Sequence, residues 1–158
     1  MDYSSTLLLP QTQFSLRRNS LICDILLQVW QVYNVYQKSI QKQRNDHKEF
    51  FIVCDGPPFA NGHLHLGHAL NKYIKDTICR IKRLQGYAVV YVPGWDCHGL
   101  PIESKVELTF GKANKDNVIE FREECAKYAQ SWIDIQKQEF IQLGIEADWH
   151  NFYATMNK

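Results

Sequence analysis

Apolar side chains recur at every third or fourth position in three stretches of the chain, residues 22–42, 66–86 and 117–143. This spacing is the period of an α-helix, so we predict a helix in each stretch. In the middle stretch the basic side chains fall on the face opposite the apolar one; they are Lys72, Lys75, Arg80, Lys82 and Arg83. A glycine ends each of the last two helices, and Asn117 with Glu120 resembles a capping box.

Two continuous apolar runs, residues 50–54 and 87–92, flank the middle helix. Short apolar runs stopped by glycine and proline are typical of buried parallel strands. The order strand, helix, strand predicts a βαβ unit, and therefore an α/β domain. Both runs end in glycine-rich loops, residues 55–62 and 93–99, which we expect to meet at one edge of the sheet. Open α/β sheets bind ligands at that edge, so we place the functional site there.

Composition narrows the class of protein. The chain has 158 residues, 45% of them hydrophobic, and a formal net charge of +1, which excludes a disordered or collagen-like protein. No apolar run approaches the length of a membrane span. The five cysteines form no CxxC pair, and we expect a reducing, cytoplasmic setting. Arg17 and Arg18, with few acids nearby, leave a mitochondrial address open.

The charge is unevenly distributed. Residues 17–115 carry a net charge of +6, and residues 116–158 carry −4. Two interpretations are open: two solvated helix surfaces of opposite sign, or a phosphate-handling part followed by an acidic segment.

Three of the six histidines lie within six positions, at His63, His65 and His68. They could bind a metal ion, although no acid precedes the last one and no HExxH motif exists. They could be structural, capping a helix start. They could form a nucleotide site, because a helix that begins near Gly67 presents unpaired backbone N–H groups, and imidazole N–H groups can donate to phosphate oxygens. Donors placed there would stabilise charge that develops in a transition state.

Two blocks carry a resemblance to a known family. Residues 55–68 (DGPPFANGHLHLGH) resemble the signature region of class I aminoacyl-tRNA synthetases, with the signature itself at residues 65–68 (HLGH). Residues 93–103 (PGWDCHGLPIE) are similar to a second block in the isoleucine branch of that family. The residues that follow the signature and the N-terminal arm are also similar to that branch, so the resemblance covers nearly the whole chain.

The resemblance implies a role for individual residues. His65 and His68 would hold the ATP phosphates and act in catalysis, and Gly67 would let adenine approach the backbone. Gly56 and Pro57 would line the isoleucine pocket, and Asp96 would receive the substrate ammonium. That last role suits a carboxylate at a strand end, and the alternative for Asp96 is a helix N-cap. Three further residues are expected to support the site without touching substrate: Asn61, Trp95, which we expect to pack in the core, and His98.

The resemblance also implies a fold and partners. Residues 1–48 would form an N-terminal arm and helix, and residues 49–158 the first half of a Rossmann-like catalytic domain that ends before an editing insertion. The family uses ATP with Mg²⁺ to convert isoleucine to its adenylate and then charges tRNA(Ile). It would have no membrane partner, act as a monomer and hold zinc only in a module outside these residues. Because half of the ATP site would be missing, we expect this chain to be inactive by itself. The alternative is a non-catalytic module that binds a nucleotide or a partner.

Overall fold

The computed structural model describes residues 3–8, 11–13, 17, 19–114 and 116–157, and its contacts group the chain into two compact units, residues 1–33 and 34–158. The first unit holds a short 3₁₀-helix, η1 (Ser4–Thr6), and helix α1 (Ser20–Val32). Of the predicted N-terminal arm, Asp2, Pro10 and Phe14 lie outside the described residues. Among the described helices, none has the length and apolar character needed to cross a membrane.

The single helix predicted over residues 22–42 is two helices. α1 ends at Val32 and α2 (Val35–Asn45) begins after Asn34, which adopts the left-handed conformation with φ 52° and ψ 46°. Asparagine tolerates this conformation better than most residues. The apolar period continues across the break, so periodicity alone could not show it. α2 also extends to Asn45, beyond the predicted end at residue 42.

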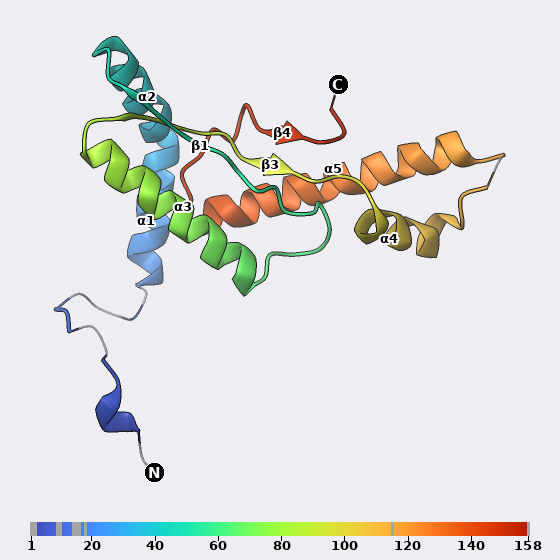
Figure 1. The fold of residues 1–158 in the computed structure, drawn as a ribbon, viewed down its shortest axis with the longest axis horizontal. Helices are drawn as coiled ribbons and strands as arrows, with labels where there is room; N and C mark the ends of the chain where they lie inside the picture. Colours follow the sequence, from blue (N-terminus) through green and yellow to red (C-terminus); the bar gives the residue numbers. More distant parts are fainter. Residues whose placement is uncertain (1–2, 9–10, 14–16, 18, 115, 158) are drawn as a thin grey trace. The chain divides into compact units, whose positions relative to one another are not determined.

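The predicted βαβ unit is present in the second unit (Figure 1). Strand β1 (Phe50–Val53) is followed by helix α3 (Leu66–Leu84) and strand β2 (Ala88–Tyr91). β1 and β2 pair in parallel, with Phe50 opposite Ala88 and Val53 opposite Tyr91. The α/β class with parallel strands is therefore confirmed.

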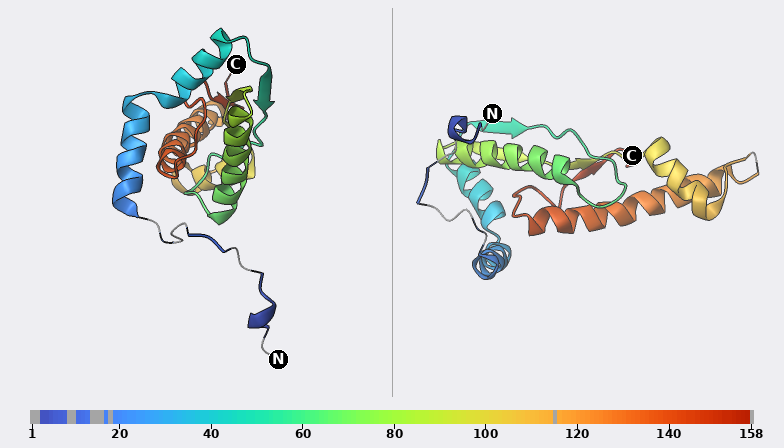
Figure 2. Two further views of the ribbon diagram at one scale, coloured as in Figure 1. Left: turned by 90° about the vertical axis from the view of Figure 1, so that its left-hand side faces the viewer. Right: turned by 90° about the horizontal axis from the view of Figure 1, so that it is seen from below.

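The remainder of the second unit contains two helices and a second parallel pair. Strand β3 (Gly94–Trp95) leads into helix α4 (Leu100–Phe110), which sequence periodicity did not predict. The long helix α5 (Val118–Gln142) follows, and strand β4 (Tyr153–Ala154) pairs in parallel with β3. Figures 1 and 2 show α4 beside the N-terminal half of α5 and α3 beside its C-terminal half. The capping box predicted at Asn117 is wrong, because the Asn117 side chain makes no cap bond and accepts from Asn114 N at 2.7 Å instead.

The core lies between α5 and the strands. Its fully buried side chains include Tyr91 and Trp95 from the strand region and Ile133 and Phe140 from α5. Trp95 packs edge-on against Phe152, with ring centroids 5.3 Å apart. The segment after α5 thus returns to the strands and closes the core from the C-terminal side.

Helix α3 buries the face that the sequence marks as basic. Lys72 is 2% exposed, Asp76 is 6% exposed, and Cys79, one turn after Asp76 on the same face, is fully buried. The apolar stripe points to solvent: Leu70 is 61% exposed and Ile74 53%. Lys72 therefore does not belong to a solvated basic surface, and a buried anion must compensate its charge.

The continuous apolar run of β1 predicted a strand buried on both faces, but only one face of β1 is buried. Phe51 and Val53 pack against the core, while Phe50 is 53% exposed and Ile52 68% exposed. Within the described residues β1 pairs only with β2, so its other edge and one face stay accessible. Continuous apolar character is typical of strands covered on both faces.

Candidate functional site

The two glycine-rich loops meet, as the strand order predicts. Asp96 N donates to the Pro58 carbonyl and Ala60 N donates to the Asp96 carbonyl, each at 2.8 Å. These bonds form an isolated parallel bridge between Phe59 and Asp96. The first loop, with Gly56 and Pro57, is thereby fastened to the second loop at the residue expected to receive an ammonium group.

His65 and His68 form the cap of α3. His65 is the N-cap residue, and its Nδ1 accepts a hydrogen bond from Gly67 N at 3.1 Å. His68 Nδ1 accepts in turn from His65 N at 3.3 Å, and the two rings stack with centroids 3.9 Å apart. The prediction that histidines cap a helix start is therefore confirmed for His65 and His68.

The cap determines which ring nitrogen carries the proton. A ring nitrogen that accepts from a backbone N–H cannot itself be protonated, so a neutral ring carries its proton on Nε2. Burial, with smaller contributions from His65 and Lys72, lowers the pKa of His68, which keeps that ring neutral near pH 7. Each imidazole thus presents an Nε2–H donor at the start of a helix, where the helix dipole favours an anion.

Gly67 is required for this cap. A Cβ atom at Gly67 would lie 2.9 Å from His65 Cε1 and 3.0 Å from His65 Nδ1. The missing side chain accommodates the His65 ring, in addition to any approach of adenine that the resemblance implies. Sequence reasoning did not foresee that contact.

His63 lies apart from the other two histidines. Its Nδ1 is 2.5 Å from Glu139 Oε1, and Glu139 Oε2 accepts from Leu64 N at 3.0 Å. The His63 ring also meets Trp132 edge-on, with centroids 5.1 Å apart. The segment before α3 is thus anchored to α5. Across the described residues, no three His, Cys, Asp or Glu side chains converge in a way that could hold a metal ion.

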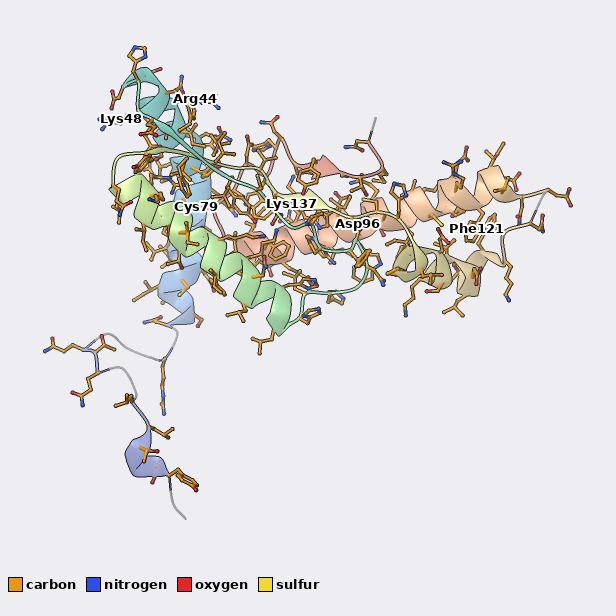
Figure 3. All side chains as sticks on the ribbon, viewed as in Figure 1. Arg44, Lys48, Cys79, Asp96, Phe121 and Lys137 are labelled. Carbon is orange, nitrogen blue, oxygen red and sulfur yellow. The ribbon has the colours of Figure 1, made fainter. Side chains whose placement is uncertain are left out.

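Asp96 lies directly after β3 (Figure 3) and is half-buried. Its Oδ1 accepts from Thr155 Oγ1 at 3.2 Å and from His98 N at 3.3 Å. The alternative that Asp96 is a helix N-cap is wrong, because the N-cap of α4 is Gly99. His98 is exposed, and its Nε2 lies 3.3 Å from the Thr155 carbonyl.

Two of the expected supporting residues contact α5. Asn61 Oδ1 accepts from the Tyr128 hydroxyl at 2.7 Å. Trp95 is fully buried, as expected for a packing residue, and its Nε1 donates to Gln136 Oε1 at 2.9 Å. Gln136 Nε2 donates to the Phe59 and Gly62 carbonyls at 3.2 and 2.8 Å.

Sequence reasoning missed both Gln136 and Asp55. Gln136 is a polar residue on the apolar face of α5, between Ile133 and Phe140, and that position was the available signal. Asp55 follows β1, and the Lys72 and Lys75 ammonium groups bond its carboxylate, Lys75 at 2.7 Å. Although burial opposes it, these lysines together lower the pKa of Asp55, so the carboxylate stays ionised.

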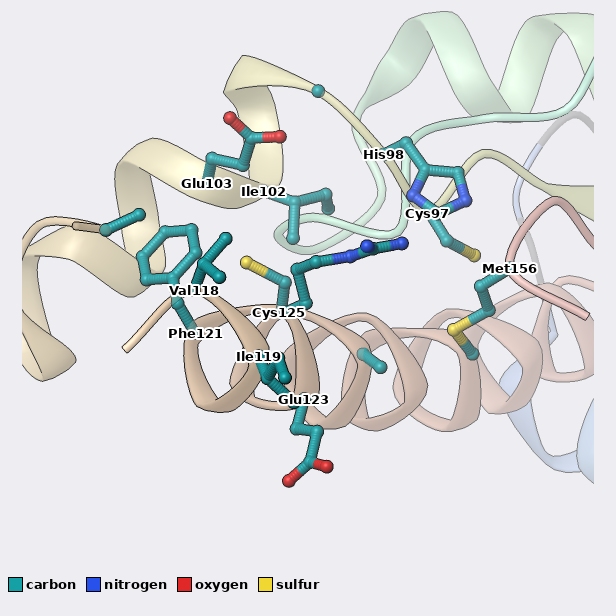
Figure 4. A pocket seen from close by; sticks show the side chains of 14 residues that line it. Cys97, His98, Ile102, Glu103, Val118, Ile119, Phe121, Glu123, Cys125 and Met156 are labelled. Carbon is teal, nitrogen blue, oxygen red and sulfur yellow. The ribbon is translucent and has the colours of Figure 1, made fainter. Parts of the chain in front are cut away.

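A cavity of about 550 Å³ lies between α4 and α5 (Figure 4). Its wall is mostly apolar, with Ile102, Phe121, Cys125 and Met156 among the lining residues. Of the expected site residues only His98 lines it. The cavity is therefore separate from the histidine turn.

Comparison with known proteins identifies the family. Residues 25–158 match the family described as tRNA synthetases class I (I, L, M and V). The chain belongs to this family. It is 49% identical over 160 residues to an isoleucine–tRNA ligase of Blochmanniella floridana, and 49% identical over 158 residues to one of Shewanella amazonensis. Each alignment covers 99% of this chain and 17% of the relative, so the chain spans about a sixth of the length of these ligases.

A solved structure agrees with this assignment. A leucyl-tRNA synthetase (LeuRS) in a ternary complex with tRNA and LeuAMS, from Agrobacterium radiobacter K84, superposes with a TM-score of 0.53 at 29% sequence identity. The match covers 77% of this chain and 15% of that one. As a member of the class I family, the chain is related to enzymes that use ATP.

Proposed function

We propose that this chain supplies the first half of the nucleotide fold of an isoleucine-activating ligase, with His65 and His68 at the ATP phosphates. The observation that carries this proposal is the capped start of α3, which presents two Nε2–H donors beside the joined loops. The two 49%-identical isoleucine–tRNA ligases support isoleucine as the amino acid.

The proposed chemistry needs no covalent nucleophile on the protein. A carboxylate oxygen of isoleucine bonds to the α-phosphorus of ATP, and the bond from that phosphorus to the bridging oxygen breaks, which releases pyrophosphate. Negative charge on the phosphate oxygens is stabilised by the His65 and His68 donors and by the helix dipole. Mg²⁺ enters with ATP as part of the substrate, and the aminoacyl group then passes to tRNA(Ile).

The proposed amino-acid pocket is formed by Asp96 of one loop and by Gly56 and Pro57 of the other. Asp96 Oδ1 has two weak donors at 3.2 and 3.3 Å, and the half-buried carboxylate has capacity for a substrate ammonium. Gly56 carries no side chain, and nothing lies within 4 Å of the position that its Cβ would take. Pro57 adds an apolar wall beside it, where an aliphatic side chain would pack.

A chimaera tests this function. Residues 1–158 replace the matching segment of the Blochmanniella floridana ligase, and isoleucine-dependent exchange of pyrophosphate into ATP is measured. We expect exchange with isoleucine, weaker exchange with valine, and loss of exchange when His65 and His68 are both changed to alanine. A chimaera that folds but shows no exchange overturns the proposal. The 158-residue chain alone is expected to show no exchange, because it spans only 17% of the relatives.

The second candidate, a non-catalytic partner-binding module, is favoured by the exposed apolar stripe of α3 and the exposed face of β1. The exposed apolar surfaces of such a module would need a partner to cover them. Sedimentation of the chain with and without a candidate partner separates the two functions, since activation of isoleucine predicts no dependence on such a partner.

A further inference from the structure

The Asp55 carboxylate is a junction between three elements. Its side chain is fully shielded from solvent, and it lies immediately before Gly56 and Pro57. It accepts hydrogen bonds from Lys72 and Lys75 of α3, from the Tyr91 hydroxyl of β2 at 3.1 Å and from Gly94 N of β3 at 3.0 Å. One buried anion thus joins the helix that carries the histidine turn to both strands beneath it.

The backbone of Asp55 adds a fourth element. Its carbonyl accepts from the Tyr153 hydroxyl of β4 at 2.9 Å. The Tyr153 ring lies over Gly94, and a Cβ at Gly94 would come within 2.0 Å of the ring. The end of β1 is therefore packed against β3 and β4 at the point where the chain continues to Asp96.

The buried anion explains the orientation of α3. Lys72 is 2% exposed and lies one helical turn after His68, so both side chains fall on the inward face of the helix. The Lys72 ammonium lies 3.0 Å from the Tyr91 hydroxyl and 5.1 Å from the Phe140 ring centroid. An ammonium group in such a place requires a paired carboxylate. Because Lys72 pairs with Asp55, the basic face of α3 lies toward the core and the apolar stripe of the helix faces solvent.

We propose that Asp55 is a positioning residue for the site: its contacts with Lys72, Lys75 and Gly94 hold the His65–His68 turn and the Asp96 loop in their relative places. The chemical consequence rests on the proposed function, whereas the placement is a property of the fold. Asp55 does not itself receive a substrate ammonium, because four donors already occupy its buried carboxylate. Asp96 is the carboxylate at this edge that is open to a ligand.

The test compares Asp55→Asn with Asp76→Asn. Asp76 is a matched control, because it is also buried on α3, pairs with Arg80 Nε at 2.7 Å and accepts from Glu146 N at 3.0 Å. Neither of these partners of its carboxylate belongs to the two loops. The first readout is the ¹⁵N spectrum of the histidine rings in the 158-residue chain, which reports the Nε2–H tautomer without any ligand. The second is isoleucine-dependent exchange in the chimaera, with kcat and KM separated.

In Asp55→Asn we expect His65 and His68 to lose the single tautomer, and kcat to fall by about 10- to 100-fold while the KM for isoleucine changes less than about threefold. Asp76→Asn should lower the melting temperature yet keep both the tautomer and kcat. Unchanged ring spectra in a folded Asp55→Asn chain overturn the proposal.

A double variant covers the case in which Asp55→Asn does not fold. Asp55→Asn with Lys72→Met removes both charges, so no unpaired ammonium stays buried, and the same loss of tautomer is expected. If the unsubstituted chimaera shows no exchange, the proposed function fails, and the ring spectra of the chain still decide the role of Asp55.

Discussion

Gln136 offers a direct test of how α5 holds the two loops. Its carboxamide is fully buried and makes three hydrogen bonds, to Trp95 Nε1, the Phe59 carbonyl and the Gly62 carbonyl. The substitution Gln136→Met keeps a similar side-chain length and removes all three bonds. The two loops would then contact α5 without this polar link.

The expected cost follows from these bonds. Each hydrogen bond contributes about 1 kcal/mol net, and a buried donor left without a partner costs about 1–3 kcal/mol. Trp95 Nε1 is such a donor, because the tryptophan is fully buried, whereas the Phe59 carbonyl still accepts from Asn61 N at 2.8 Å and Gly62 is only half-buried. We therefore expect Gln136→Met to lower the unfolding free energy by about 2–4 kcal/mol, and the melting temperature by roughly 5–15 °C.

Urea unfolding followed by tryptophan fluorescence and by circular dichroism gives the free energy. The control is Gln130→Met on the same helix, since Gln130 is exposed and bonds only Asp134 at 3.1 Å among the bonds described here. That variant should stay within about 0.5 kcal/mol of the unsubstituted chain. A Gln136→Met chain no less stable than the Gln130→Met chain would refute the account of the loop anchor.

Three further outcomes are expected. Gly94→Ala should destabilise the second unit by about 1–3 kcal/mol in thermal unfolding, because its Cβ would meet the Tyr153 ring. Adding Tyr153→Ala to the same chain should recover part of that loss. A Gly94→Ala chain as stable as the unsubstituted chain would contradict the packing. The pKa of His68 is lowered in the folded chain, so the unfolded state binds the proton more tightly. The unfolding free energy should therefore fall as the pH drops through about 6.5. His68→Asn should flatten that part of the profile, and an unchanged profile in His68→Asn would contradict this explanation. Burial raises the pKa of Cys79 to about 11. A thiol reagent at pH 8 should therefore label the exposed Cys54 quickly and label Cys79 only after unfolding. Fast labelling of Cys79 in the folded chain would show that α3 is oriented differently.

Sequence patterns located the elements better than they oriented them. The apolar runs and the glycines placed β1, α3 and β2 within a few residues, because strands and helix ends depend on local chemistry. The orientation of α3 was missed, because it depends on the pairing of Lys72 with Asp55, seventeen positions away, and no periodic pattern records that contact. α4 was missed because its first residues directly follow the glycine-rich loop of residues 93–99 and include Pro101, a residue type that breaks helices in their interior but is well suited to the first turn.

In the candidate site, too, sequence patterns located residues but did not reveal their buried contacts. The junction of the two loops followed from the strand order, and the histidine turn was recognised from its residues alone. The cap bonds of His65 and His68 were foreseen only as one alternative, and neither Gln136 nor Asp55 was identified. Both are polar groups buried by tertiary contacts, and burial is a property that a single sequence reveals only when a polar residue interrupts an apolar face.

The most direct measurement of the central claim is a titration of the chimaera, ¹⁵N-labelled at its histidines, with MgATP, observed at the histidine ring nitrogens. If the capped turn of α3 receives the phosphates, the Nε2 resonances of His65 and His68 shift together on addition of MgATP, while those of His47 and His150 stay in place. Shifts of equal size at all histidines, or no shift at His65 and His68 at saturating MgATP, would contradict the claim.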